Sequence, residues 1–272
     1  MVSWLITGSN RGIGLEFVRQ LSADPNNIVF AVTRNKSTST DLLELESQLN
    51  NVFVLQADIT DVPGLRNAAQ EVEKITDGTL DVLINNGAYL SPERVDYTID
   101  MYDGKEDLLD ADFGNFFRVN VLGVIKTTNV FLPLLRKTSQ TSLAKVITIS
   151  SGVGDPDFAV KTAFDFAAPY AISKAAANMA NAKYAARFKE ENFLFLSLSP
   201  GFGNTRPGLP GEVQKGLSSL YVNKFRAAYP DWDGTLLTPD QSVTAMLDVV
   251  SRLTAKDTGA FLSHRGESKN WL

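Results

Sequence analysis

The sequence of 272 residues predicts a single-domain, doubly wound α/β fold, with a parallel seven-stranded sheet and helices on both faces. Short apolar runs alternate along the chain with longer amphipathic segments, which is the pattern of strands joined by crossover helices. Most of the short runs are apolar at nearly every position, as expected for strands buried on both faces. No internal repeat or linker-like segment interrupts this alternation.

The individual elements follow from the same pattern. Strands are predicted over residues 2–6, 28–33, 52–56, 80–84, 145–149, 193–198 and 260–262. Helices are predicted over residues 12–23, 41–50, 63–76, 108–135, 169–191 and 239–254. Asp61 and Thr238 are candidate helix caps, because a proline follows each within the first helical turn. Residues 91–107 and 202–238 show neither pattern and are predicted to be irregular.

The composition argues against several classes of protein. A net charge of −5 and the lack of any basic run argue against a nucleic-acid partner. The sequence has no cysteine, which excludes disulfides, thiol catalysis and thiolate metal sites. The one histidine, His264, cannot form a zinc site of the usual several-histidine kind, and we expect it at the surface and no metal in the protein.

The sequence also argues against a membrane partner. No run approaches the roughly 18 consecutive apolar residues of a membrane span. The first residues lack a basic leader and run directly into a glycine-rich loop that must stay in the folded protein. We therefore expect a cytoplasmic protein.

The glycine-rich loop directly follows the first predicted strand. It reads Thr7-Gly8-Ser9-Asn10-Arg11-Gly12-Ile13-Gly14 and leads into a helix. This arrangement brings unpaired backbone N–H groups and the positive end of the helix dipole against a pyrophosphate. The spacing differs from the Gly-x-Gly-x-x-Gly of many dinucleotide sites. The loop predicts a dinucleotide site, and a glycine turn without a ligand is the alternative.

The end of the second predicted strand indicates which dinucleotide binds. About 20 positions beyond the glycines, an acidic residue binds the ribose 2′-hydroxyl of NAD, whereas an arginine accommodates the 2′-phosphate of NADP. Arg34 stands at this distance, no carboxylate lies at the strand tip, and Arg11 can approach the same phosphate. Because two guanidinium groups suit a phosphate dianion, we expect NADP(H) in preference to NAD(H). The alternative is that both arginines are ordinary solvated charges.

A tyrosine and a lysine four residues apart form the candidate catalytic pair. Tyr170 and Lys174 lie at the start of an alanine-rich predicted helix, where this spacing puts both side chains on one face. An ammonium group beside a phenol favours the phenolate and lowers its pKa toward the range useful for proton transfer. By itself the pair is a weak signal, because the same spacing arises by chance in many helices.

Together these motifs resemble the short-chain dehydrogenase/reductase family, in its compact, Rossmann-type branch of NADP(H)-dependent ketoreductases and carbonyl reductases. The resemblance runs along nearly the whole chain, in the order Thr7-Gly8-x-x-x-Gly12-x-Gly14, Asp58, Asn85-Asn86-Gly87-Ala88, Asn120, Ser151, Tyr170 with Lys174, and Pro200-Gly201.

The resemblance implies four catalytic residues. Tyr170 would be the acid/base, Lys174 its tuner and a ribose ligand, Ser151 the hydrogen-bond partner of the carbonyl or alcohol, and Asn120 the holder of a proton-relay water. The neighbouring Ser150 is the alternative to Ser151, which the family register favours. Hydride transfer to a carbonyl carbon places negative charge on the oxygen, which two hydroxyl groups can stabilise and protonate.

The resemblance also implies the cofactor contacts. Asp58 resembles the adenine-binding aspartate, Asn86 lies in the loop beside the adenosine ribose, and Thr205 corresponds to a threonine near the nicotinamide amide. The order Asn-Asn-Gly-Ala differs from the commoner Asn-Asn-Ala-Gly. The full expected set is Gly8, Ser9, Asn10, Arg11, Gly12, Ile13, Gly14, Arg34, Asp58, Ile59, Asn86, Gly87, Ala88, Tyr170, Lys174, Pro200, Gly201 and Thr205.

The predicted function is hydride transfer between NADP(H) and a carbonyl or secondary alcohol. Residues 1–100 would mainly bind the dinucleotide, residues 101–272 would carry catalysis and substrate binding, and a lid would span about 202–238. Two long loops, one between Ser151 and Tyr170 and one after Pro200, favour a bulky apolar or aromatic ketone or aldehyde. Apolar loop residues, however, more often pack the rim of a domain or a subunit contact. The apolar side chains of the two loops are Phe158, Phe164, Phe166, Phe202, Leu209, Leu217, Tyr221, Phe225 and Trp232.

The resemblance implies a homo-oligomer, a dimer or tetramer, because the helices that carry Asn120 and Tyr170 form dimers in this family. The alanines that follow Lys174 would permit such contacts and would equally suit packing on the sheet. Two other functions stay open. One is a regulator that binds the dinucleotide without turnover, and the other is a scaffold for a non-redox step in which NADP(H) is structural.

Overall fold

The seven predicted strands form one parallel sheet. In this computed structural model, which describes residues 1–91, 93–203 and 221–272, they are β1 (Val2–Thr7), β2 (Asn27–Thr33), β3 (Val52–Gln56), β4 (Val82–Asn85), β5 (Ala144–Ile149), β6 (Phe193–Ser199) and β7 (Phe261–Ser263). Their spatial order is β3-β2-β1-β4-β5-β6-β7, and all neighbours are parallel. The winding direction reverses between β1 and β4, where sheets of this kind bind ligands at the carboxyl ends of their strands.

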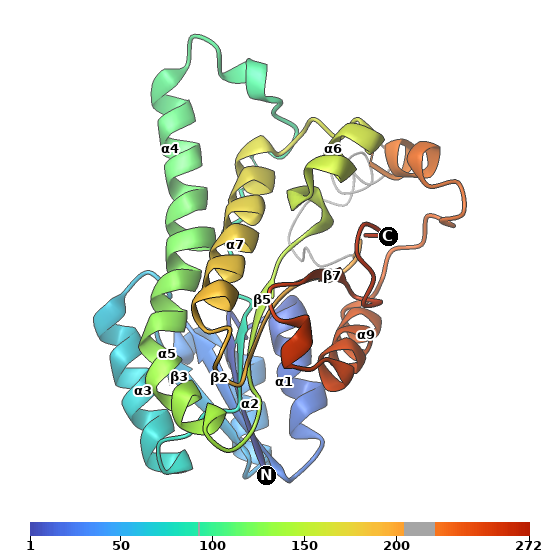
Figure 1. Cartoon of the computed structure of the whole chain (residues 1–272). Coiled ribbons are helices and arrows are strands. Elements are labelled where there is room, and N and C mark those ends of the chain that lie inside the picture. The colour runs from blue at the N-terminus through green and yellow to red at the C-terminus, as the bar shows by residue number, and fades with distance from the viewer. Residues whose placement is uncertain (92, 204–220) are drawn as a thin grey trace.

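Helices cover both faces of the sheet (Figure 1). One face carries α1 (Gly12–Ser22), α2 (Thr40–Gln48) and α9 (Pro239–Arg252). The other carries α3 (Val62–Thr76), α5 (Val124–Ser139) and α7 (Ala168–Arg187). Consecutive strand residues serve opposite faces: Leu5 joins the core under the second group of helices and Ile6 the core under the first. The predicted fold class is confirmed.

Both predicted helix caps are confirmed. Asp61 accepts a hydrogen bond from the Gly64 N–H at 3.2 Å, with Pro63 in the first turn of α3. Thr238 and Gln241 form a reciprocal capping box at the start of α9.

The helix predicted over residues 108–135 contains a change of helix type. It consists of α4 (Glu106–Phe117), the π-helical turn η3 (Arg118–Gly123) and α5, which follow one another without a break. Turns of π-helix inside α-helices are frequent at functional sites, and Asn120 lies in this one.

Short helical segments occur at three places where no helix was predicted. They are η2 (Ile99–Tyr102), α6 (Pro156–Thr162) and residues 221–228. Segments of this length are too short for a helical period to be read from the sequence. The remaining short turns are η1 (Lys36–Thr38), η4 (Gly152–Gly154) and η5 (Ala255–Asp257). Within the described residues, no helix has the length and apolarity needed to cross a membrane.

Candidate active site

The predicted site residues gather at the carboxyl edge of the sheet. The glycine loop follows β1, Asn86 follows β4, Ser151 follows β5 and Gly201 follows β6. Residues far apart in the sequence meet here because parallel strands present the same end to one edge.

The glycine loop has little room for side chains. Gly8 and Gly12 adopt φ values of +66° and +57°, which L side chains rarely adopt. A Cβ atom on Gly14 would lie 2.2 Å from the carbonyl oxygen of Gly8. The glycines therefore allow a turn in which the start of α1 approaches the end of β1.

Asn86 and Thr7 fix this turn. The Asn86 side-chain amide donates to the carbonyl oxygens of Thr7 and Gly8 at 2.9 and 3.1 Å. The Thr7 hydroxyl accepts from the N–H groups of Asn86 and Gly87 at 3.1 and 3.0 Å. Ser9 is fully buried and its hydroxyl donates to the Ile6 carbonyl at 2.6 Å. Asn86 and Ser9 thus shape the predicted cofactor loop through their own side chains.

The end of this loop offers groups for an anion. Arg11 is the N-cap residue of α1 and makes no side-chain capping hydrogen bond, which leaves the first N–H groups of this helix for another acceptor. Arg11 and Arg34 are exposed, and neither side chain has a hydrogen bond or ion pair with another described residue. The neighbouring Lys36, in contrast, is paired with Glu46 at 3.0 Å. Asn10 is exposed and Ile13 is half-buried beside them.

Asp58 and Ile59 lie after β3 on the same edge. The Asp58 carboxylate accepts from the N–H and hydroxyl of Thr60, both at 2.7 Å, and is half-buried. Ile59 is 8% exposed and packs close to Gly87 and Gly123. Ala88, three residues after the end of β4, is exposed.

Lys174 is buried beneath Tyr170. Its ammonium group donates to the carbonyl oxygen of Ile149, the last residue of β5, at 2.8 Å and lies 5.6 Å from the centre of the Tyr170 ring. The lysine is 5% exposed, and burial lowers its pKa to about 8. The Lys174 side chain, one helical turn after Tyr170, thus joins α7 to the end of β5, two residues before Ser151.

Tyr170 itself stands at the first turn of α7 and is half-buried. Its ring makes an edge contact with Phe116 at a centroid distance of 6.2 Å, and Phe116 makes one with Tyr89 at 4.8 Å. Beside it lies a small pocket whose apolar wall includes Leu90 and Val95. The same pocket is also lined by Arg94 and Asp112, so apolar and charged side chains both border Tyr170.

Asn120 connects the loop after β4 to α7. Its side-chain oxygen accepts from the Tyr89 N–H at 2.7 Å, and its amide donates to the Ser173 hydroxyl at 2.9 Å. The Ser173 hydroxyl in turn donates to the carbonyl of Tyr170 at 2.7 Å. Our sequence analysis did not single out Tyr89 or Ser173. Ser173 could have been found from the sequence, because it stands between Tyr170 and Lys174 in the candidate catalytic motif.

The structure separates the two adjacent serines. Ser150 is 2% exposed, and its hydroxyl has no hydrogen-bond partner among the described residues. Ser151 is half-buried at the start of η4. Ser151 therefore has the greater access to a ligand, in agreement with the family register.

Gly201 adopts a φ of +77° after Pro200 and packs against His264: a Cβ atom there would lie 2.7 Å from the imidazole Nδ1. His264 is 3% exposed, so the expectation of a surface histidine is wrong. β7 carries it into the interior beside the end of β6, and burial lowers its pKa. Thr205 lies outside the described residues.

The apolar residues of the long loops mostly pack against one another. Phe158, Tyr221 and Phe225 are buried together with Trp271 and Leu272 in what we call the aromatic cluster. Its partly buried members include Phe164, Phe166, Phe202, Tyr229, Trp232 and Phe261. The alternative that these residues pack the rim of the domain thus holds for the buried members. Leu209 and Leu217 lie outside the described residues.

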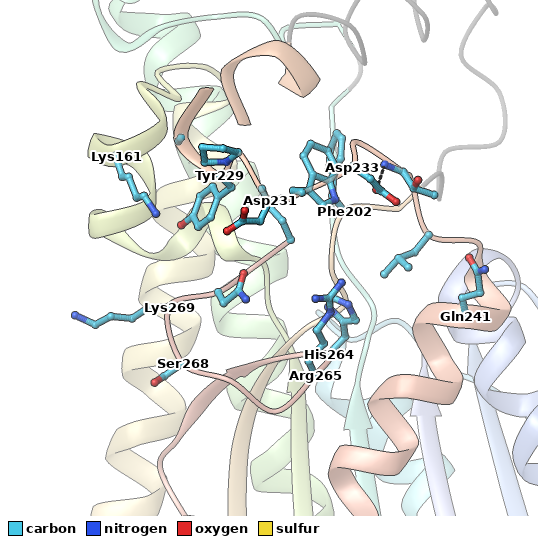
Figure 2. A pocket seen from close by; sticks show the side chains of 17 residues that line it. Lys161, Phe202, Tyr229, Asp231, Asp233, Gln241, His264, Arg265, Ser268 and Lys269 are labelled. Carbon is cyan, nitrogen blue, oxygen red and sulfur yellow. Dashed lines mark hydrogen bonds between the residues drawn. The ribbon is translucent and has the colours of Figure 1, made fainter. Parts of the chain in front are cut away.

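A separate cavity of about 700 Å³ lies between α6, residues 228–233 and the segment after β7. Figure 2 shows Lys161 and Tyr229 on one side of it and His264 and Arg265 nearer to Gln241 of α9. Its lining includes none of Ser151, Tyr170, Lys174 and Asn120. Nowhere in residues 1–91, 93–203 and 221–272 do three or more His, Asp or Glu side chains form a group that could hold a metal ion.

Comparison with known proteins agrees with this geometry. The family model described as short chain dehydrogenase matches residues 3–208. A short-chain dehydrogenase/reductase of Arthrinium sp, atnB, is 40% identical over the full length of both chains, and AacuF of Aspergillus aculeatus is 42% identical, also over both full lengths. The chain belongs to the short-chain dehydrogenase family.

Two solved structures show the same fold. The NADPH-bound carbonyl reductase from chicken fatty liver is 30% identical, has a TM-score of 0.78 and matches over 99% of this chain and 98% of its own. The carbonyl reductase Sniffer of D. melanogaster, 22% identical, has a TM-score of 0.79 over 100% of both chains.

Proposed function

We propose that this protein reduces carbonyl compounds with NADPH and that Tyr170 is its proton donor. The observation that carries the proposal is the buried Lys174, held by the last carbonyl of β5 beneath the Tyr170 ring. A carbonyl reductase described as NADPH-bound, 30% identical over nearly the whole chain, supports the same cofactor and reaction.

The residues at the sheet edge fit NADP(H). The uncapped start of α1 suits the pyrophosphate. Arg11 and Arg34, both exposed, suit the 2′-phosphate, and Asp58 and Ile59 stand where the resemblance expects the adenine. By the family resemblance, Lys174 would also bind a ribose of the cofactor, and Gly201 would contact the cofactor. In this proposal residues 1–100 mainly hold the dinucleotide, and residues 101–272 supply catalysis and substrate binding.

The chemistry is divided between cofactor and protein. When bound, NADPH supplies the hydride. The Ser151 hydroxyl donates a hydrogen bond to the carbonyl oxygen, where negative charge develops. Tyr170 gives that oxygen its proton, and the charged Lys174 favours the phenolate that remains. Asn120 serves the proton relay and fixes the loop of Tyr89 against α7.

Replacing Tyr170 by Phe tests the proposal. The change removes only the phenol oxygen, so turnover in NADPH-consuming assays with bulky aromatic ketones and aldehydes should fall at least 100-fold, within the usual range for a general acid. Binding of NADPH, measured by calorimetry, should persist. Wild-type turnover in the folded, cofactor-bound variant would contradict the assignment, and so would a wild-type protein that consumes no NADPH with any carbonyl compound.

The cofactor preference is tested at Arg34. Replacing it by Met should raise the Kd of NADPH about tenfold, because a charge-assisted hydrogen bond to phosphate is lost, and should leave the Kd of NADH unchanged. Arg187→Met, at the exposed end of α7, is the matched control. If wild-type protein binds NADH more tightly than NADPH, the preference is wrong.

The substrate is proposed to be a bulky apolar or aromatic ketone or aldehyde. Leu90, Val95 and Phe116 border Tyr170 and support this class. A dinucleotide-binding role without turnover, or a non-redox step, is not favoured, because neither needs a buried lysine beneath a tyrosine. The lid over 202–238 and the cytoplasmic location stay predictions, and cell fractionation would test the location.

A homo-oligomer is part of the proposal. Four large apolar side chains are exposed on α4, η3 and α7, the helices that carry Asn120 and Tyr170 or lead to them. They are Phe117 at 43%, Leu122 at 41%, Ile172 at 44% and Met179 at 60% exposure. We call this set the helical patch. Exposed apolar side chains on neighbouring helices support a contact with a second copy of the chain.

A further inference from the structure

The turn that follows Ser151 is packed from two sides. The N–H of Gly152 donates to the Ser199 hydroxyl at the end of β6, at 3.0 Å. On the other side, a Cβ atom on Gly152 would lie 2.4 Å from Cβ and 2.7 Å from Cγ of Trp271. Such distances leave no room for any side chain at position 152. The residue after Ser151 is therefore held between β6 and Trp271.

Trp271 is itself fixed in place. It is 3% exposed, and its ring stacks on Phe261 of β7 at a centroid distance of 4.1 Å and an angle of 24°. Its indole N–H donates to the carboxylate of Asp155 at 2.8 Å. A buried indole N–H that is paired in this way prefers one orientation of the ring.

Asp155 joins Trp271 to the turn after Ser151. One of its oxygens receives the Trp271 N–H, and the other accepts from the Asp157 N–H at 3.1 Å and so caps α6. Its own N–H donates to the carbonyl of Gly152 at 3.0 Å, and the N–H of Gly154 donates to the carbonyl of Ser151. The hydrogen bonds thus run from Trp271 through Asp155 into η4, which begins directly after Ser151.

A second contact joins the same two segments at the surface. Lys269, two residues before Trp271, pairs with Asp157 at 2.9 Å. Figure 2 shows Lys269 on the segment after β7 and Lys161 on α6. Both residues line the cavity that lies between these two segments. The contact through Trp271 is the buried part of this junction.

From this geometry we infer that Trp271 is a positioning residue for Ser151, acting through Gly152 and Asp155. The inference rests on the proposed function, in which the Ser151 hydroxyl binds the substrate oxygen. A serine displaced by about 1 Å can lower turnover on the order of 100-fold. The contacts that hold Trp271 are with Gly152, Asp155 and Phe261, which lie outside the dinucleotide loop after β1, so the affinity for NADPH should not depend on it.

The test uses Trp271→Phe, which keeps an aromatic ring on Phe261 and removes the indole N–H. We expect kcat for a carbonyl substrate to fall about tenfold, as a partial displacement would produce, with the Kd of NADPH unchanged. Trp4→Phe is the matched control, because Trp4 also loses an indole hydrogen bond, to Asn27 at 3.2 Å, in the first strand away from the site. It should keep the wild-type kcat.

A double-mutant cycle separates positioning from general destabilisation. If Trp271 acts through Ser151, then Trp271→Phe should cost nothing further in a Ser151→Ala background. An equal loss in both backgrounds, or a kcat of Trp271→Phe equal to that of the control, would overturn the inference. Gly152→Ala is a second variant: its methyl group meets Trp271, and kcat should again fall without a change in the Kd of NADPH.

A readout without turnover keeps the inference apart from the proposed function. Amide hydrogen exchange of residues 152–155 should become faster in Trp271→Phe, while exchange in the glycine loop stays the same. Unchanged exchange in residues 152–155 would contradict the positioning role. An inactive wild-type protein, or an active Ser151→Ala variant, would instead contradict the proposed function.

Discussion

Lys174 shows how a single residue can serve chemistry at the expense of stability. A buried ammonium group lacks hydration, and the Ile149 carbonyl that accepts its hydrogen bond is neutral. Its pKa falls from 10.5 to about 8 for this reason. The unfolded chain then binds the proton more tightly than the folded chain between these two values, so the free energy of unfolding rises with pH across that window.

Replacing Lys174 by Met should therefore stabilise the fold and abolish turnover. At pH 7 the wild-type lysine carries the cost of its buried charge, and we expect the variant to gain about 2 kcal/mol in free energy of unfolding. The wild-type contribution that rises from pH 8 to 10.5 should disappear. Urea unfolding at pH 7 and pH 10 measures both effects, and a variant that is less stable than wild type at pH 7 would show that the lysine is not destabilising.

Several site residues could be predicted from the sequence because the backbone conformation at their positions requires glycine. Gly8, Gly12 and Gly14 occupy positions where a positive φ or a close approach leaves no room for Cβ. His264 could not be assigned in this way. Its burial depends on β7 pairing with β6 and on Gly201 leaving space for the ring, and these contacts join positions far apart in the chain.

At the scale of elements, the segment after β4 depends on one partly buried ion pair. Arg94 donates two hydrogen bonds of 2.6 Å to Asp112 of α4, and the Tyr102 hydroxyl donates a third at 2.9 Å. Asp112 is 2% exposed, and the hydrogen bonds from Arg94 are the main cause that lowers its pKa. The three groups fasten residues 93–102 to α4 beside Tyr170.

Removing Arg94 should destabilise this element strongly. Arg94→Met leaves a buried carboxylate with one remaining side-chain donor, which costs about 3 kcal/mol in free energy of unfolding. Arg136→Met breaks an exposed pair with Glu191 and should change stability little. The midpoint temperatures of thermal unfolding of the two variants measure this difference. Equal midpoints would mean that the Arg94–Asp112 pair stabilises the fold no more than a surface ion pair does.

The elements that the sequence predicted well are those with a long, regular pattern of apolar residues. The strands and the helices longer than two turns are within a few residues of their predicted limits. The π-helical turn at Asn120 was missed because one extra residue does not alter an apolar pattern visibly. α6 was missed because its seven residues are held by an Asp155 cap and by the aromatic cluster more than by a pattern of their own.

At the scale of the whole molecule, segments that follow four different strands meet over the carboxyl edge of the sheet. The Tyr221 hydroxyl donates to the carbonyl of Val95 at 3.2 Å, which joins the segment after β6 to the segment after β4. Trp271 joins the segment after β7 to the turn after β5. Substrate selection is therefore a property of several strand ends together, and no single motif in the sequence predicts it.

The helical patch leads to a prediction about assembly. Ile172 and Met179 are seven residues apart on α7, so they lie on one face of the helix, and α7 packs beside α4 (Figure 1). In a twofold dimer each residue of such a patch contributes twice to the contact. The double variant Ile172→Glu with Met179→Glu should therefore be monomeric at concentrations where the wild-type protein is a dimer or tetramer.

Sedimentation equilibrium of the two proteins measures this directly. Val160→Glu is the control, because Val160 is 85% exposed on α6 and lies outside the helical patch. It should keep the wild-type mass, since a charge added to a surface that no partner covers costs nothing in association. A monomeric wild-type protein, or a double variant that keeps its oligomeric mass, would show that the helical patch faces solvent and that α7 supports catalysis without a second copy of the chain.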